Sequence, residues 1–218
     1  LWMAKVQDRD GAWRGSNFMG VGRVYDTYMD APLLQLYECT GAAELRTAAL
    51  LNLDWVLGQR RANGWFVNAD NTMRHNDRPI THTIAYTLDG LIECGVRTSN
   101  GRYTEAARPA ARRLAEVFLE QGRLHGRYDA TWRGSEHPLM TGCAQLAIVW
   151  SRLDAIEPDS VLGEARDRMV TYLMGVQDLS RKGPEGVHGA MPGSSPLWGR
   201  YEKFAFPNWG TKYFADAL

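Results

Sequence analysis

The segment THTIAYTLDGLIECG, Thr81–Gly95, decides the fold class of this chain. It is apolar on almost every side, so a helix built from it must be buried on several faces. Three other segments share this design and begin at Tyr25, Met140 and Pro207. Recurrence of one helical unit along a chain is typical of repeat architectures, and we therefore expect four equivalent, deeply packed helices.

Amphipathic segments lie between these four, over residues 44–59, 101–121 and 162–177. Each has one apolar stripe and a charged opposite face, as expected for a helix that covers a core. No sustained alternation of apolar and polar residues predicts strands. The sequence therefore predicts an all-α protein, an α/α toroid of inner and outer helices. We expect one domain over 1–218, a partial ring of about three and a half helical hairpins. Because the chain opens as the end of an outer helix, we expect that N-terminal hairpins precede it.

The composition is that of a globular protein, with 44% hydrophobic and 23% charged residues. Twenty-five basic residues balance twenty-five acidic ones, which argues against a nucleic-acid partner, and no apolar run is long enough for membrane insertion. The three cysteines include no close pair, which favours a reducing, cytoplasmic location. No zinc-ligand spacing, phosphate-binding loop or dinucleotide motif is present, so we expect no metal and no cofactor. The oligomeric state is left open.

The loops that lead into the inner helices are rich in aromatic and polar residues. In a toroid such loops meet at one end of the ring of inner helices, which we call the mouth. Aromatic faces there would stack on sugar rings, although each such ring could equally fill the core. The candidate substrate-binding residues are Trp65, Asn68, Arg127, Tyr128, Trp132, Arg133, Trp198, Tyr201, Asn208 and Trp209.

The candidate catalytic residues belong to two chemistries that the sequence does not separate. Asp26, Asp70 and Asp129 are the carboxylates nearest the predicted mouth, and two of them across a sugar would serve a glycosidase. Each could instead cap a helix. His82 and Tyr86 share one face of the helix over 81–95 and would serve a lyase that acts beside a uronate.

Several of these strings resemble a family of bacterial α/α-toroid proteins encoded among genes for exopolysaccharide or lipopolysaccharide assembly. They are NGWF at 63–66 with the segment 81–95, GRYDATWRGS at 126–135 with LMTGCAQLAIVWSRL at 139–153, and PNWGTKYFADAL at 207–218. Some members carry the label δ-aminolevulinic acid dehydratase, which an all-α chain does not support. The wider fold is similar to that of uronate lyases and unsaturated glucuronyl hydrolases. The resemblance implies a glycan substrate but assigns no catalytic residue.

Our leading hypothesis is a polysaccharide hydrolase or lyase that acts on a bacterial, uronate-containing glycan. His82, Tyr86 and Asp129 would transfer protons, and Arg127 and Arg133 would hold a carboxylate. One alternative is a non-catalytic glycan-binding or polysaccharide-assembly protein. The second is an isoprenoid binder similar to prenyltransferases or terpene cyclases.

Overall fold

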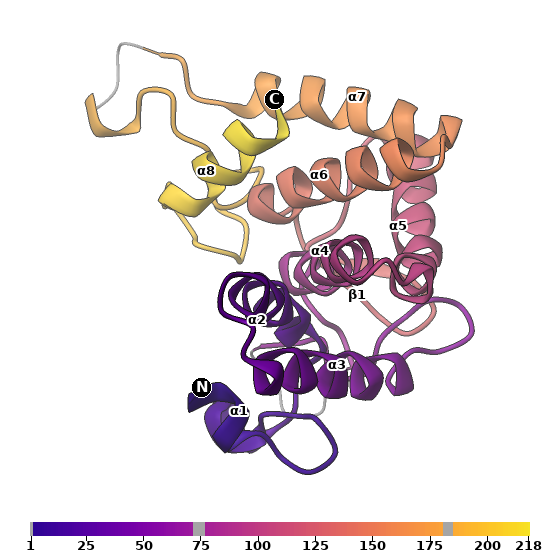
Figure 1. Ribbon diagram of the computed structural model, residues 1–218. Coiled ribbons are helices and arrows are strands. Elements are labelled where there is room, and N and C mark those ends of the chain that lie inside the picture. Colours follow the sequence, from indigo (N-terminus) through magenta and orange to yellow (C-terminus); the bar gives the residue numbers. More distant parts are fainter. Residues whose placement is uncertain (1, 72–76, 181–184) are drawn as a thin grey trace. The chain divides into compact units, whose positions relative to one another are not determined.

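The computed structural model describes residues 2–71, 77–180 and 185–218. Its α-helices are α1 (Trp2–Val6), α2 (Thr27–Thr40), α3 (Ala43–Gly58), α4 (Thr81–Thr98), α5 (Gly101–Gln121), α6 (Met140–Ile156), α7 (Ser160–Val176) and α8 (Asn208–Ala217) (Figure 1). Short 3-10 turns are η1 (Arg14–Ser16), η2 (Phe18–Gly20), η3 (Val24–Asp26) and η4 (Glu185–Val187). Strands β1 (Arg127–Tyr128) and β2 (Gly134–Ser135) form one antiparallel hairpin. The predicted all-α class is confirmed.

The chain divides into two compact units, Leu1–Ala110 and Ala111–Leu218. In the first unit α2 packs against both α3 and α4, and α1 packs against α3. The α2–α4 crossing is very close, because a Cβ atom on Gly90 would lie 2.4 Å from the backbone carbon of Thr27. Thr27 Oγ1 donates a hydrogen bond to the carbonyl of Thr87 at 3.1 Å across the same crossing. A glycine at position 90 therefore fixes the place where α2 begins relative to α4.

The second unit packs α6 against α7 and α8. The side chains of α6 are buried nearly all round, as the sequence predicts, and Trp150 Nε1 donates to the carbonyl of Ala111 at 2.9 Å. Asp159 caps α7, because its side chain accepts a hydrogen bond from the backbone N–H of Val161 at 3.0 Å. The core of this unit is therefore built around the first three turns of α6, whereas Ser151, Arg152, Ala155 and Ile156 near its end are exposed.

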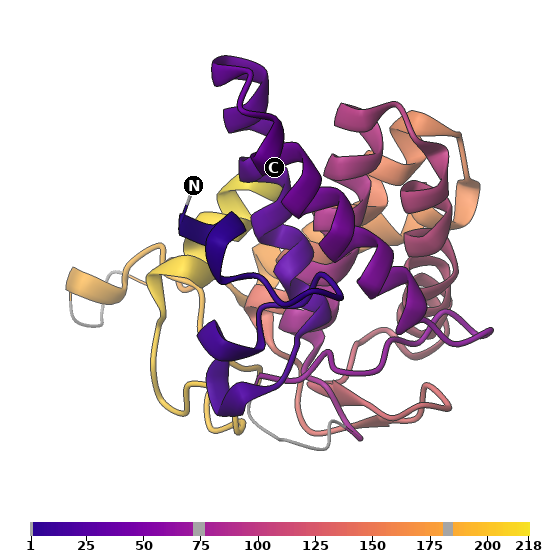
Figure 2. The same cartoon turned by 60° about the horizontal axis from the view of Figure 1, so that its bottom comes forward.

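The loop before α8 is attached to the start of α6 by backbone hydrogen bonds. Met140 N donates to the carbonyl of Gly193 at 3.1 Å, and Ser195 N donates to that of Pro138 at 3.1 Å. A β-bridge between Leu139 and Ser194 lies between these two bonds. The two loops consequently lie at the same end of the helices of this unit, where Figure 2 shows them.

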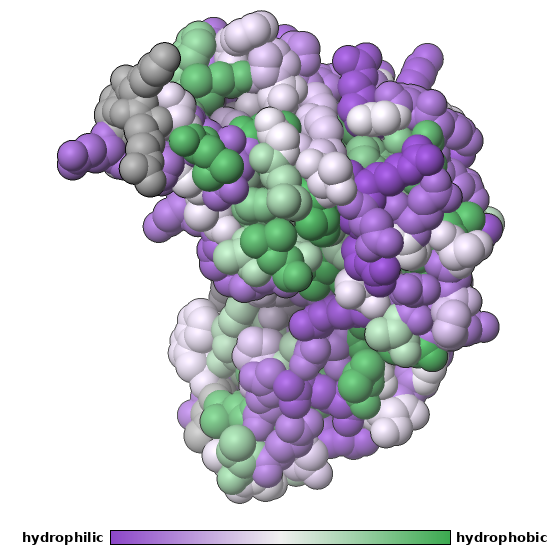
Figure 3. All heavy atoms as spheres, turned by 90° about the horizontal axis from the view of Figure 1, so that it is seen from above, coloured by the Kyte–Doolittle hydropathy of each residue, from purple (hydrophilic) through white to green (hydrophobic). Residues whose placement is uncertain are grey.

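The surface is mixed in character. On the face that Figure 3 presents, hydrophobic side chains form separate patches within a largely hydrophilic surface. Among the described residues, no helix combines the length and the apolar character that crossing a bilayer requires.

Candidate functional site

Asp26 stands at the junction of η3 and α2 and is the best-defined candidate carboxyl of the first unit. Asp26 is 7% exposed and occupies the N-cap position of α2, but its side chain forms no capping hydrogen bond to the helix, so the capping role that the sequence offered as an alternative is not performed by this carboxyl. Asn17 Nδ2 donates to its Oδ2 at 2.6 Å. Burial raises the pKa of Asp26 to about 6, although the bond from Asn17 and the charge of Arg23 act in the opposite direction. Asp26 therefore changes protonation state near neutral pH.

A second carboxylate and a guanidinium lie in the surroundings of Tyr25. Arg23 and Asp70 are both fully buried. Burial is the main reason why the pKa of Tyr25 rises to about 12, and the negative charges of Asp26 and Asp70 raise it further, whereas the charge of Arg23 lowers it. Two of the three predicted carboxylates, Asp26 and Asp70, are therefore brought near one phenol within this unit.

The loop before α4 is linked to the segment before α2, since Val24 N donates to the carbonyl of Asn68 at 3.1 Å. Asn68 has a positive φ of 62°, and its Nδ2 donates to Gln59 Oε1 at 3.2 Å. Trp65 is buried, with the guanidinium of Arg61 5.1 Å from its ring centre. In this structure Asn68 and Trp65 organise the loop and do not offer an open face to a sugar.

His82 and Tyr86 lie together on α4, as their spacing predicts, with ring centres 4.4 Å apart. Tyr28 on α2 joins them, and its ring centre is 4.5 Å from that of Tyr86. Tyr28 belongs to one of the polar, aromatic segments that lead into the inner helices, but it was not among the candidate catalytic or binding residues. A signal was present, because Tyr28 follows Asp26 by two residues in the first turn of an inner helix.

Asp129 belongs to the second unit, where it organises the turn of the β1–β2 hairpin. Its Oδ1 accepts hydrogen bonds from Thr131 N, Thr131 Oγ1 and Arg133 N at 2.9, 2.7 and 3.0 Å. These bonds, led by that from the Thr131 hydroxyl, lower the pKa of Asp129 to about 2. An aspartate that is ionised throughout the neutral range is a poor proton donor, so this geometry does not favour the acid role that we expected of it.

The remaining predicted residues of this hairpin differ in accessibility. Tyr128 is fully buried, its hydroxyl accepts from His125 N at 2.9 Å, and burial raises its pKa. Trp132 is buried as well. Arg127 forms an ion pair with Glu136 at 3.5 Å, whereas Arg133 is exposed apart from its contact with Asp129. Tyr128 is thus a core residue in this structure.

Exposed aromatic rings occur in and after the loop that precedes α8. Trp198 is 62% exposed and Trp209 is 42% exposed. Trp209 Nε1 donates to the hydroxyl of Tyr201 at 3.0 Å, which fixes these two rings relative to each other. Asn208, also exposed, is the first residue of α8. A ligand can therefore reach all four predicted residues of this segment, which are Trp198, Tyr201, Asn208 and Trp209.

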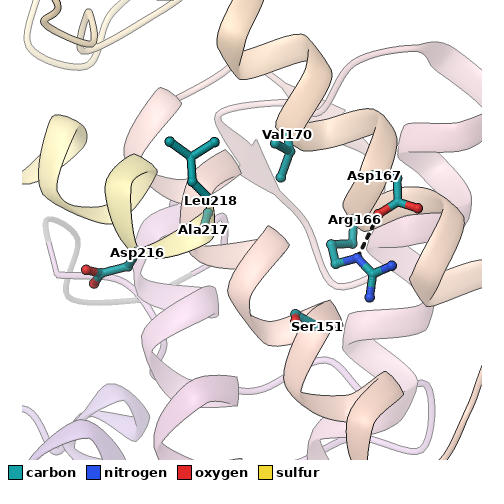
Figure 4. Close-up of a pocket in the computed structure, with 7 residues that line it drawn as sticks. All are labelled: Ser151, Arg166, Asp167, Val170, Asp216, Ala217 and Leu218. Atoms are coloured by element: carbon teal, nitrogen blue, oxygen red, sulfur yellow. Dashed lines mark hydrogen bonds and ion pairs between the residues drawn. The ribbon is translucent and has the colours of Figure 1, made fainter.

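A pocket of about 480 Å³ lies elsewhere in the second unit (Figure 4). Arg166 Nε contacts Asp167 Oδ1 at 2.8 Å at its edge. This pocket lies near the C-terminal end of α6, whereas the β1–β2 hairpin precedes the N-terminal end of that helix. None of the predicted site residues lines the pocket. Its lining residues are Ser151, Arg166, Asp167, Val170, Asp216, Ala217 and Leu218. Within the described ranges, no group of three or more metal-ligating side chains is placed to hold an ion.

Comparison with solved structures places the fold among α/α toroids. An unsaturated glucuronyl hydrolase from Bacillus sp. GL1, described as responsible for the degradation of glycosaminoglycan, has a TM-score of 0.75 and 16% sequence identity over 99% of this chain and 64% of its own. A polysaccharide lyase has a TM-score of 0.68 at 14% identity, over 98% of this chain and 62% of its own. A D-mannose isomerase has a TM-score of 0.68 at 12% identity, over 87% and 54%.

The chain thus spans 64% of the length of the hydrolase. No protein-family model matches the chain, and no curated protein is similar to it in sequence. The predicted α/α-toroid fold is confirmed. Because these three neighbours carry out three different reactions, the fold by itself does not select one.

Proposed function

We propose that this chain forms part of a carbohydrate-active enzyme that hydrolyses a uronate-containing bacterial glycan, with Asp26 as the acid–base carboxyl. The proposal depends on the protonation of the Asp26 carboxyl. Glycoside hydrolysis needs a carboxyl that can be protonated near neutral pH, and burial gives Asp26 a pKa of about 6. The α/α-toroid hydrolase and lyase among the structural neighbours support a glycan substrate.

A second residue of the same unit would assist this chemistry. Asp70 is the other carboxylate that acts on Tyr25, and it is the candidate for the partner that a glycosidase requires. The second unit, taken by itself, presents the exposed rings of Trp198 and Trp209, whose faces suit stacking on sugar rings. The gene context implied by the family resemblance points to exopolysaccharide or lipopolysaccharide as the source of the substrate.

The test is mass spectrometry of the products formed when the protein is incubated with uronate-containing and neutral bacterial polysaccharides. Fragments that have gained one water establish hydrolysis. Unsaturated fragments would establish β-elimination instead and move the assignment to His82 and Tyr86, whose rings are in contact. Saturable binding without any product would favour the glycan-binding or assembly alternative.

The role of Asp26 is tested by Asp26→Asn, which keeps the side-chain shape but cannot donate an acidic proton. We expect turnover to fall by about 10²–10⁴-fold while the helical circular dichroism is retained. Asp167→Asn is the matched control, since it makes the same change at an exposed carboxylate that forms an ion pair with Arg166. Full turnover by Asp26→Asn would show that another group transfers the proton.

A further inference from the structure

Asp30 lies on α2 one helical turn after Asp26, and its carboxyl is fully buried. Neither Oδ1 nor Oδ2 accepts a hydrogen bond within the part of the chain that the structure describes. An ionised carboxylate withdrawn from water is strongly disfavoured unless donors or a cation compensate it. The surroundings of Asp30 therefore fit a protonated carboxyl, which is itself a donor.

In the part of the chain that the structure describes, the side chains packed against this position supply no compensating charge. The buried side chains of α3, against which α2 packs, are Leu45, Ala48, Ala49, Asn52, Leu53 and Val56, and none of them titrates. On α4, Asp30 acts on Cys94, whose pKa is raised first by burial and then by the charge of Asp30. Glu93, Arg97 and Asp89 act on Cys94 as well.

The positive charge of Arg23 lowers the pKa of Asp26, whereas the charge that acts on Asp30 is the negative charge of Asp26. Before α2, Arg23, Tyr25 and Asn17 surround Asp26. Burial raises the pKa of Asp30 well above its usual range, and the negative charge of Asp26 raises it further. The two carboxyls are i and i+4 neighbours, the separation at which side chains of a helix meet on one face.

We propose that Asp30 is a positioning residue for Asp26: it remains a neutral carboxylic acid and donates its O–H to the carboxylate of Asp26 once Asp26 has released its proton. This inference rests on the proposed function. In the proton transfer, Asp26 gives its proton to the leaving glycosidic oxygen, and Asp30 keeps its own proton throughout. The hydrogen bond stabilises the ionised form of Asp26 and so sets the pH at which Asp26 acts.

A purely structural role would not call for a carboxyl here. An asparagine would fill nearly the same volume without a group that must stay protonated at neutral pH. Buried titratable groups that weaken the folded state are typical of functional sites, where stability is exchanged for activity. A protonated neighbour also keeps a single negative charge on the pair after Asp26 ionises.

The experiment is a carboxyl NMR titration of the protein labelled with ¹³C at its aspartate side chains. In the unaltered protein we expect the Asp30 carboxyl to remain protonated at pH 7 while Asp26 titrates near pH 6. In Asp30→Leu we expect the titration of Asp26 to move upward by about one pKa unit, the size of a lost hydrogen bond to a charged group. Asp30→Asn keeps an N–H donor, so its Asp26 should titrate near the original value.

Leu34→Ala, a cavity-forming change one turn further along α2, controls for loss of packing and should leave the titration of Asp26 in place. An Asp30 carboxyl that is ionised at pH 7 in the unaltered protein overturns the inference without any variant being needed. An unmoved Asp26 in Asp30→Leu also overturns it.

The same variants separate this inference from the proposed function. If the titrations behave as expected but no glycan is cleaved, the proposed function fails and the carboxyl pair stands. If Asp26→Asn abolishes turnover while Asp30→Leu leaves both the titration and the pH profile of kcat/KM unchanged, the function stands and the role of Asp30 fails.

Discussion

Substitution of Gly90 by alanine tests whether the close α2–α4 crossing holds the first unit together. The added Cβ would lie 2.4 and 2.5 Å from the carbonyl carbon and oxygen of Thr27, whereas carbon atoms normally pack at about 3.5–4.0 Å. The helices must therefore separate by about 1 Å. Overpacking of this kind costs about 2 kcal/mol, and loss of the bond from Thr27 to Thr87 costs about 1 kcal/mol.

The higher helix propensity of alanine offsets about 1 kcal/mol of this cost. The net loss in free energy of unfolding is about 2 kcal/mol, which in a chain of this size corresponds to a fall in Tm of about 4–8 °C. Urea unfolding followed by circular dichroism measures it. Gly175→Ala, at an α7 position with nothing within 4 Å of the added Cβ, should instead gain about 0.5–1 kcal/mol. If both variants are stabilised alike, the crossing is not tight and our account of it is refuted.

Three further predictions concern stability. Asp30→Asn should stabilise the protein increasingly as pH rises above about 4, because the unfolded chain releases a proton that folded Asp30 retains; a pH-independent difference in urea midpoint would contradict this. Trp150→Phe should cost about 2 kcal/mol, because it removes buried ring atoms and the indole hydrogen bond to the carbonyl of Ala111, which keeps its bond within α5; equal urea midpoints would exclude that role. Asp159→Ala should lower the free energy of unfolding by about 1 kcal/mol through loss of the α7 cap. Asp159→Asn should retain most of this stability in the same assay, because asparagine also caps helices.

The positions of the main helices could be predicted because their sequences are apolar all round or striped at the helical period. Helix ends were harder to place. Gly95, which ends the quoted segment, lies inside α4, where a Cβ would meet Thr104 Cγ2 at 2.7 Å. The sequence does not tell whether a glycine is required for close packing or ends a helix. The difference depends on whether another element, here the segment around Thr104, packs against it.

The candidate site was predictable by residue type but not by accessibility. Aromatic residues beside glycine turns include both Trp65, which is buried, and Trp198, which is exposed, because the path of the loop decides which ring packs inward. Asp129 could not be recognised as a turn former before its contacts to Thr131 were known. Asp30 did leave a signal, as a second carboxylate four residues after Asp26 in an apolar helix, with no basic residue in that helix.

The hydrogen bonds that join the loop before α8 to the start of α6 affect how this protein could be engineered. Because Gly193 and Ser195 pair with backbone groups that flank Leu139, a length change in either loop would shift the other. A library that varies only one of them would mostly sample mismatched pairs. Residues 134–139 and 193–206 should be randomised together, with Gly193 and Ser195 kept fixed. The loop that carries the exposed Trp198 could then be varied without loss of the backbone hydrogen bonds that attach it to the start of α6.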